Sequence, residues 1–237
     1  MKLDLVLPTS IAPSILILLG LALIVSIIAG LAFWLGPGRA KPAKLDDPDQ
    51  PQPFGYRMAW LAIKTRETSQ VVEALGLENM RRVNWRSGIS TVYDERVAEQ
   101  SVFVTTPVAG WTFIVGLALP QPLGGRFTDL VSPLINKLGQ QFAEVDYFFS
   151  SPDIEHYAWA RVIDCKLMRA FAWGDEGVIW NKGRLTKEEK ALGINVLDLR
   201  ALNLSTTTLD EFEDATVFPC EDHVIELASA WSVDPTT

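Results

Sequence analysis

The feature that most constrains this chain is an uncharged stretch of twenty-five residues near its start, Ile11 to Leu35. As an α-helix with a rise of about 1.5 Å per residue it would be about 37 Å long, whereas the hydrocarbon core of a bilayer is about 30 Å thick. Only two hydroxyls, those of Ser14 and Ser26, interrupt its apolar surface, and a hydroxyl can bond back to its own helix inside lipid. The stretch is predicted to be a transmembrane helix.

Two other interpretations of this stretch are weaker. A buried helix of a soluble domain normally keeps one polar stripe along its surface, which this stretch lacks. A cleavable signal peptide has an apolar run of about 7 to 15 residues and a small-residue cleavage site, whereas this run is longer and ends in Phe33-Trp34-Leu35. In a spanning helix, Trp34 would lie in the aromatic belt at the membrane interface.

The charges that flank the span predict its orientation. Lys2 precedes it, whereas Arg39, Lys41 and Lys44 follow it within ten residues. Because Lys and Arg near a span are retained on the cytoplasmic side, we expect the C-terminal part of the chain to be cytoplasmic. The predicted location is the cell (inner) membrane of a bacterial-type cell, with a single pass.

The chain therefore divides into four parts: a tail of residues 1–10, the span of 11–35, a linker of 36–53 and a domain of 54–237. The linker holds five prolines and no apolar periodicity, which is typical of an extended, semi-rigid spacer. The domain is long enough to bury one hydrophobic core.

Charge restricts the partners of this domain. Residues 45–237 carry 17 Lys and Arg against 28 Asp and Glu, a net charge of about −11. Binding to nucleic acid or to the surface of an anionic bilayer requires a basic face, so the composition argues against both. A basic protein partner is compatible with it, although a surface charge that only keeps the protein soluble is the simpler explanation.

The first half of the domain predicts an α+β fold. An apolar strand is expected over Tyr56 to Thr65, followed by a short helix from Thr68 or Ser69 to Leu75 that stops at Gly76. A second strand is expected over Met80 to Trp85, in which Met80, Arg82 and Asn84 would face one way and Arg81, Val83 and Trp85 the other. Two further strands are expected on either side of a turn, over Ser101 to Thr105 and over Trp111 to Leu119, the latter central in the sheet.

The second half predicts an antiparallel meander between helices. Helical periodicity covers Thr128 to Phe142, although Ser132-Pro133 indicates a later start. From Val145 to Trp180, aromatic and β-branched segments separated by short turns predict sequential antiparallel strands. Thr186 begins a capping box and a short helix that Gly193 stops, and a last helix begins at Glu221. The fold class is α+β, with a mainly antiparallel sheet and two or three packed helices.

The candidate binding residues are aromatic residues of the meander and two acidic residues in one of its turns. Three tryptophans are expected on adjacent strands, and we expect part of this sheet face to remain uncovered by helices. Because Trp and Tyr concentrate in interface hot spots, such a face would bind a protein; a second buried layer is the alternative. The candidate binding residues are Tyr157, Trp159, Trp173, Trp180, Asp175 and Glu176.

Catalytic signatures are weak, and the sequence predicts no cofactor and no metal site. The two histidines, His156 and His223, show no metal-ligand spacing. Cys165 is expected in a tight turn, as Asp-Cys in place of Asp-Gly, and the pairing of Cys165 with Cys220 is left open. A phosphate site at Leu123 to Arg126, ahead of a helix, lacks the known glycine motifs.

The sequence thus predicts a membrane-anchored, non-catalytic domain that binds another protein. An acidic, anchored domain would suit a neutralising, immunity-type partner of a basic toxin or a subunit of an envelope complex. The alternative is a membrane-anchored enzyme for a small or envelope-derived substrate, with His156, Cys165 or acidic residues in its site. A deep pocket in which these polar groups converge would favour the enzyme.

Overall fold

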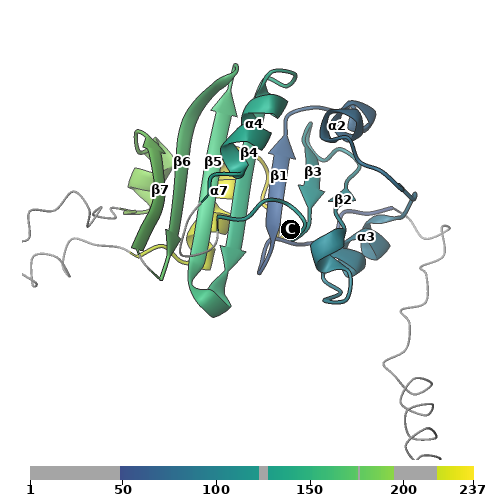
Figure 1. Ribbon diagram of the computed structural model, residues 1–237, viewed down its shortest axis with the longest axis horizontal. Helices are drawn as coiled ribbons and strands as arrows, with labels where there is room; N and C mark the ends of the chain where they lie inside the picture. Colours follow the sequence, from purple (N-terminus) through teal and green to yellow (C-terminus); the bar gives the residue numbers. More distant parts are fainter. Residues whose placement is uncertain (1–48, 123–127, 176, 195–217) are drawn as a thin grey trace, which may run out of the picture. The chain divides into compact units, whose positions relative to one another are not determined.

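The domain is built on one antiparallel sheet, which is seen in a computed structural model that describes residues 49–122, 128–175, 177–194 and 218–237 (Figure 1). Seven strands lie in the order β2-β3-β1-β4-β5-β6-β7, and all neighbouring pairs are antiparallel. The strands are β1 Ala59–Ile63, β2 Phe103–Val104, β3 Thr112–Val115, β4 Glu144–Ser151, β5 His156–Ile163, β6 Lys166–Gly174 and β7 Gly177–Gly183.

Helices cover both faces of this sheet. On one face lie α2 Thr68–Leu75 and α4 Val131–Gly139; on the other lies α7 Glu221–Trp231, with α3 Trp85–Val92 beside β2 (Figure 1). The remaining elements are short: η1 Ala98–Gln100, η2 Pro152–Ile154 and α5 Lys187–Ala191. The α+β class and the antiparallel sheet are confirmed. We call the two sides the α4 face and the α7 face.

Several predicted elements are confirmed where local signals were strong. Gly76 ends α2 in a left-handed conformation, with φ 67°. Helix α4 begins at Val131, later than its apolar periodicity suggested, and the Ser132 amide donates to Asp129 Oδ1 at 2.8 Å. Strands β4 to β7 form the predicted meander, and β5 alternates as expected: Tyr157 and Trp159 join one core, whereas Ala158, Ala160 and Val162 join the other.

The strand predicted over Met80 to Trp85 is wrong. Residues 80–84 are not in a strand, and Trp85 is the first residue of α3. Asn84 is the N-cap, and its side-chain oxygen accepts a hydrogen bond from the Ser87 amide at 2.9 Å. An Asn cap satisfies a helical N–H that would otherwise lack a partner. The alternation of Arg and Val in this segment therefore does not reflect sheet pairing, and the start of the domain is strand, helix, helix.

The predicted strand from Trp111 to Leu119 is shorter than expected. Strand β3 ends at Val115. Gly116 follows with a φ of 155°, and a Cβ there would lie 2.5 Å from the carbonyl oxygen of Ser101, so this close approach requires Gly. It is an inner strand, paired with β1 on one side and with the two-residue edge strand β2 on the other. The predicted span from Ile11 to Leu35 lies outside the described residues, and none of the helices within them is long and apolar enough to cross a bilayer.

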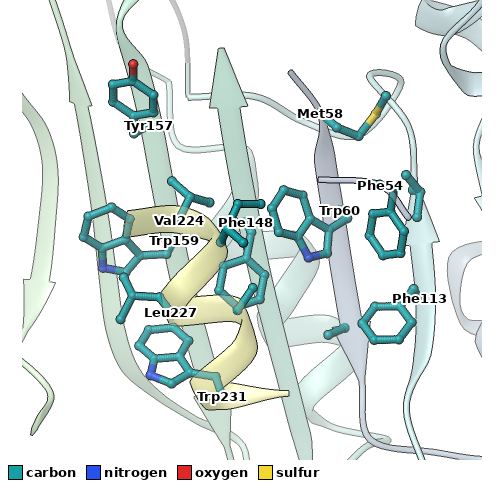
Figure 2. Close-up of a cluster of buried hydrophobic side chains, with 14 of the residues drawn as sticks. Phe54, Met58, Trp60, Phe113, Phe148, Tyr157, Trp159, Val224, Leu227 and Trp231 are labelled. Carbon is teal, nitrogen blue, oxygen red and sulfur yellow. The ribbon is translucent and has the colours of Figure 1, made fainter. Parts of the chain in front are cut away.

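An aromatic row forms the centre of the α7 face. Trp60, Phe148, Trp159 and Phe171 stand directly opposite one another on four neighbouring strands. Trp60 and Phe148 stack with ring centroids 5.2 Å apart, and Trp159 and Phe171 stack at 4.7 Å. Helix α7 lies across this row, with Val224, Leu227 and Trp231 among the aromatic rings (Figure 2). Offset stacking of this kind stabilises a core beyond the area that it buries.

Replacing Phe148 by Ala tests how much the aromatic row contributes to the stability of the domain. Phe148 is fully buried and contacts both Trp60 and Trp231. We expect the free energy of unfolding to fall by about 3–5 kcal/mol, because a core Phe leaves a cavity that relaxes only in part. The matched control is Met168→Ala at a half-exposed position, which should change stability by less than about 0.5 kcal/mol. Equal effects of the two changes in urea unfolding of the full-length chain would contradict this assignment.

Candidate functional site

The candidate binding residues do not form one exposed face. Tyr157, Trp159 and Trp180 are buried, with at most 7 % of each residue exposed. Tyr157 and Trp159 belong to the α7 face, whereas Trp180 belongs to the α4 face. The expectation of an uncovered aromatic surface is therefore wrong for these three residues, because α7 and α4 cover the two faces. Trp173 is half-buried and Asp175 is exposed, and Glu176 lies outside the described residues.

Three of the candidate residues do come together at one end of the sheet. Tyr157 pairs directly with Trp173, and Gly174 pairs with Gly177 across the turn that contains Asp175. The turn between β4 and β5 lies at the same end, since Ser151 pairs with His156. The first residues of α7 also reach it. We call this region, made of both turns, the residues before β1 and the start of α7, the hairpin end.

The hairpin end is acidic. Its basic residue, Arg57, pairs with Asp153 at 2.7 Å. Glu221 is anchored there, because its Oε1 accepts from Ser150 Oγ at 2.5 Å and from the Arg57 amide at 2.9 Å. The acidic residues of the hairpin end are Asp153, Glu155, Asp175, Glu221 and Asp222.

An aromatic contact borders the acidic residues. Phe218 is half-exposed, and its ring lies 5.5 Å from that of Trp173. The pKa of Tyr157 is raised, first by burial and then by electrostatic interaction with Glu221 and other nearby groups. The region thus combines negative potential with exposed aromatic surface. Sequence reasoning did not identify Phe218 and Glu221 as residues of this candidate site. For Glu221 there was a signal, because acidic residues are expected in the first turn of the predicted last helix.

The polar groups of the predicted enzyme alternative are not brought together. His156 begins β5 and Cys165 follows its end, so the two are separated by about 25 Å of extended chain. His156 Nδ1 donates to the Ile154 carbonyl at 2.5 Å, and its Nε2 lies 3.8 Å from Asp175 Oδ1. Within the described residues, no three His, Cys, Asp or Glu side chains are grouped to hold a metal ion.

The second cysteine and the second histidine do meet, at the start of α7. His223 Nδ1 accepts a hydrogen bond from the Cys220 amide at 3.2 Å and lies 3.4 Å from Cys220 Sγ. Cys220 is the N-cap of α7 and His223 its third residue, so this contact has the form of a reciprocal helix cap. Both cysteines are free. The sequence spacing of three residues was a signal for this pair.

A buried ionic cluster occupies the opposite end of the α7 face. Arg169, 1 % exposed, donates through Nε to Glu189 at 2.7 Å, and Glu189 also accepts from Trp159 Nε1 at 2.8 Å. Glu189 closes the predicted capping box with Thr186 as well. The sequence predicted the cap but not the buried ion pair, which depends on contacts between distant segments. A buried pair with this many hydrogen bonds fixes α5 against the sheet.

Beside this pair lies a carboxyl group with no hydrogen bond. Asp146 on β4 is fully buried, and neither of its oxygens has a hydrogen-bond partner. Burial raises its pKa well above the ordinary value, and the nearby charge of Lys64 opposes that shift only in part. Arg161 Nε lies 3.3 Å from Asp146 Oδ1, but Arg161 is hydrogen-bonded to Glu144. A perturbed, buried acid of this kind is a functional-site signal as well as a structural cost.

Comparisons with known proteins add no family assignment. No protein-family model, no curated protein and no solved structure matches this chain. The site is therefore judged from its own geometry, in which the hairpin end is the accessible feature and the ionic cluster is the buried one.

Substitution of Cys165 by Gly tests the left-handed turn that Asp164 and Cys165 form. Asp164 and Cys165 have φ values of 47° and 63°, as the predicted Asp-Gly type of hairpin turn requires. A left-handed residue with a Cβ costs about 1–2 kcal/mol, so we expect Cys165→Gly to raise the free energy of unfolding by about 0.5–1 kcal/mol after the entropy cost of Gly. Cys165→Ala, which keeps the Cβ, should give no gain. Loss of stability in the Gly variant would contradict the turn assignment.

Proposed function

We propose that this chain is a single-pass, membrane-anchored protein whose acidic α+β domain binds a basic protein partner through the hairpin end. The observation that carries the proposal is the concentration of exposed acidic side chains around Trp173 and Phe218. Four acids there are largely exposed, and Arg57 forms its ion pair with one of them. Complementary charge steers association and selects partners, and a half-exposed aromatic pair supplies the apolar contact that hot spots need.

The arrangement supports binding better than catalysis. An enzyme site needs a nucleophile or acid, an orienting base and a concave position for substrate. His156 and Cys165 lie at opposite ends of β5, and the Cys220–His223 contact caps a helix. Fixed acidic side chains on turns, by contrast, are suited to recognising a basic surface, since turns are exposed and held by the sheet.

The anchor and the orientation are part of the same proposal. The uncharged stretch from Ile11 to Leu35 would hold the domain at the cell (inner) membrane, and the Pro-rich linker of 36–53 would hold it away from the lipid. The excess of Arg and Lys after the span favours a cytoplasmic domain. A neutralising partner of a basic toxin and a subunit of an envelope complex both fit this description.

Charge reversal at the hairpin end tests the binding surface. In Glu155→Lys/Asp175→Lys, two exposed acids become basic, and we expect the basic partner to bind about tenfold more weakly, which is about 1.4 kcal/mol, mainly through slower association. The control is Glu73→Lys/Glu78→Lys, which changes the net charge equally at exposed positions in and after α2.

The measurement is co-purification of the full-length, tagged chain from detergent-solubilised membranes, with quantitative mass spectrometry of the partners. The partner should be depleted in the hairpin-end variant and retained in the α2 variant. Equal retention by both variants would rule out the hairpin end, and equal loss from both would show that net charge alone governs binding.

Fractionation of lysate tests the anchor independently of the partner. We expect the full-length chain to sediment with membranes and to resist extraction by alkaline carbonate, because a spanning helix is not released by breaking electrostatic contacts. A chain lacking residues 1–44 should stay in the supernatant. Unprocessed full-length protein in the supernatant without detergent would contradict the anchor. Reporter fusions at the C-terminus would show on which side the domain lies.

A further inference from the structure

The buried carboxyl of Asp146 lies near a second carboxylate, Glu144, and the two differ in how closely the neighbouring cations approach them. Glu144 has two cationic partners: Lys64 Nζ at 2.8 Å and the guanidinium of Arg161. Asp146, two residues further along β4 on the same face, has none at hydrogen-bonding geometry. Its nearest cation is Arg161 Nε at 3.3 Å. Glu144 is therefore close to both cations, whereas the more deeply buried Asp146 has only the longer ion pair with Arg161.

Every packed element contributes to this environment. Lys64 directly follows β1, Glu144 begins β4, and β5 supplies Arg161, which stands directly opposite Asp146. Strand β6 places Arg169 opposite Arg161, but Arg169 is committed to Glu189 of α5. Glu188 of α5 interacts with Arg161 at longer range. Helix α7 contributes the Trp231 ring, which lies 5.0 Å from the Arg161 guanidinium carbon.

The charge balance of the cluster changes when Asp146 loses its proton. With Asp146 neutral, Lys64 and Arg161 face a single carboxylate, Glu144. With Asp146 ionised, the four groups would balance as two cations and two anions. A buried carboxylate without a hydrogen bond is costly. Arg161, whose Nε is already 3.3 Å from Asp146 Oδ1, is the cation that can move closer, since Lys64 remains to pair with Glu144. The guanidinium would then turn from Glu144 toward Asp146 and change its position over Trp231.

We propose that Asp146 and Arg161 form a proton-controlled latch between the sheet and the C-terminal end of α7. Protonated Asp146 leaves Arg161 bound to Glu144 and packed on Trp231. Ionised Asp146 takes Arg161 from Glu144, and the contact with Trp231 is altered. The proton released goes to solvent, and no other group has to change its charge.

The latch predicts a pH-dependent signal at Trp231. In full-length protein labelled with 5-fluorotryptophan, in a mild non-ionic detergent, the Trp231 ¹⁹F resonance is assigned by its loss in Trp231→Phe. We expect it to move with a one-proton transition at a pH above the ordinary carboxyl pKa of about 4, because burial raises the pKa of Asp146. In Asp146→Asn it should stay at the low-pH position throughout. A resonance that does not move, or that moves equally in Asp146→Asn, would overturn the latch.

Two variants separate the latch from simpler effects. In Arg161→Gln the carboxyl can still ionise, so a full shift of the Trp231 resonance would mean a direct field effect and would overturn the proposal; loss of the shift supports it. In Glu144→Gln both cations are free for Asp146, so the transition should occur at lower pH, and this variant tests the latch even if Asp146→Asn does not fold. Asp164→Asn, at an exposed turn position at the same end, should titrate as the wild type does.

Stability gives a second readout with a definite sign. Because the pKa of Asp146 is higher in the folded than in the unfolded state, the folded state binds more protons between the two values. This group therefore lowers the free energy of unfolding as pH rises from about 4 through its folded-state pKa. The difference in stability between Asp146→Asn and the wild type should grow with pH over the same window as the ¹⁹F transition. A difference that is constant with pH would overturn the proposal.

Discussion

The constraint on which the structure depends is that its inner strands are buried on both faces. Every residue of β1 is fully buried, and β4 is buried over all but its last residue. A sheet of this kind cannot leave one face to water, so it needs two separate helical covers. Helices α2 and α4 provide one cover from segments near the strands in sequence. The other is α7, from the very end of the described chain, and the aromatic row is exposed without it.

Docking of α7 therefore completes the domain, and its two ends are held by different chemistry. At its start, Glu221 is fixed by Ser150 and by the Arg57 amide. At its end, Trp231 lies against Phe148 and under the Arg161 guanidinium. Acidic residues at the start and a cation at the end both match the direction of the helix dipole. Segments far apart in the sequence are brought together because one helix satisfies both sets of contacts.

Elements set by local signals were predictable from the sequence. The meander, the Gly76 stop and the Thr186 capping box depend on turn chemistry and alternation within a few residues. The segment from Met80 to Trp85 was misassigned because alternation alone does not distinguish an exposed loop from a strand. Asn84, a strong capping residue directly before Trp85, was the competing signal. In short segments, a capping side chain therefore outweighs two or three alternating positions.

The site was less predictable, because burial and ion pairing depend on distant contacts. Tyr157 and Trp159 were recognisable as one face of β5, but only the position of α7 decides that this face is covered. Asp146 had a recoverable signal: it shares a strand face with Phe148, and a charged residue on an apolar face requires a partner. Arg161 was predicted on the matching face of the next strand, so the opposition of the two was within reach once the hairpin register was counted.

The net charge of the domain conceals how that charge is arranged. At the hairpin end the acids outnumber Arg57, whereas at the other end of the same sheet face Lys64, Arg161 and Arg169 are matched by Glu144, Asp146 and Glu189. Helix α7 touches both regions, with Glu221 in one and Trp231 in the other. Any effect of the Arg161 contact on the hairpin end would have to pass along this helix, from Trp231 to Glu221. The proposed latch and the proposed binding surface thus share one element, although each is testable without the other.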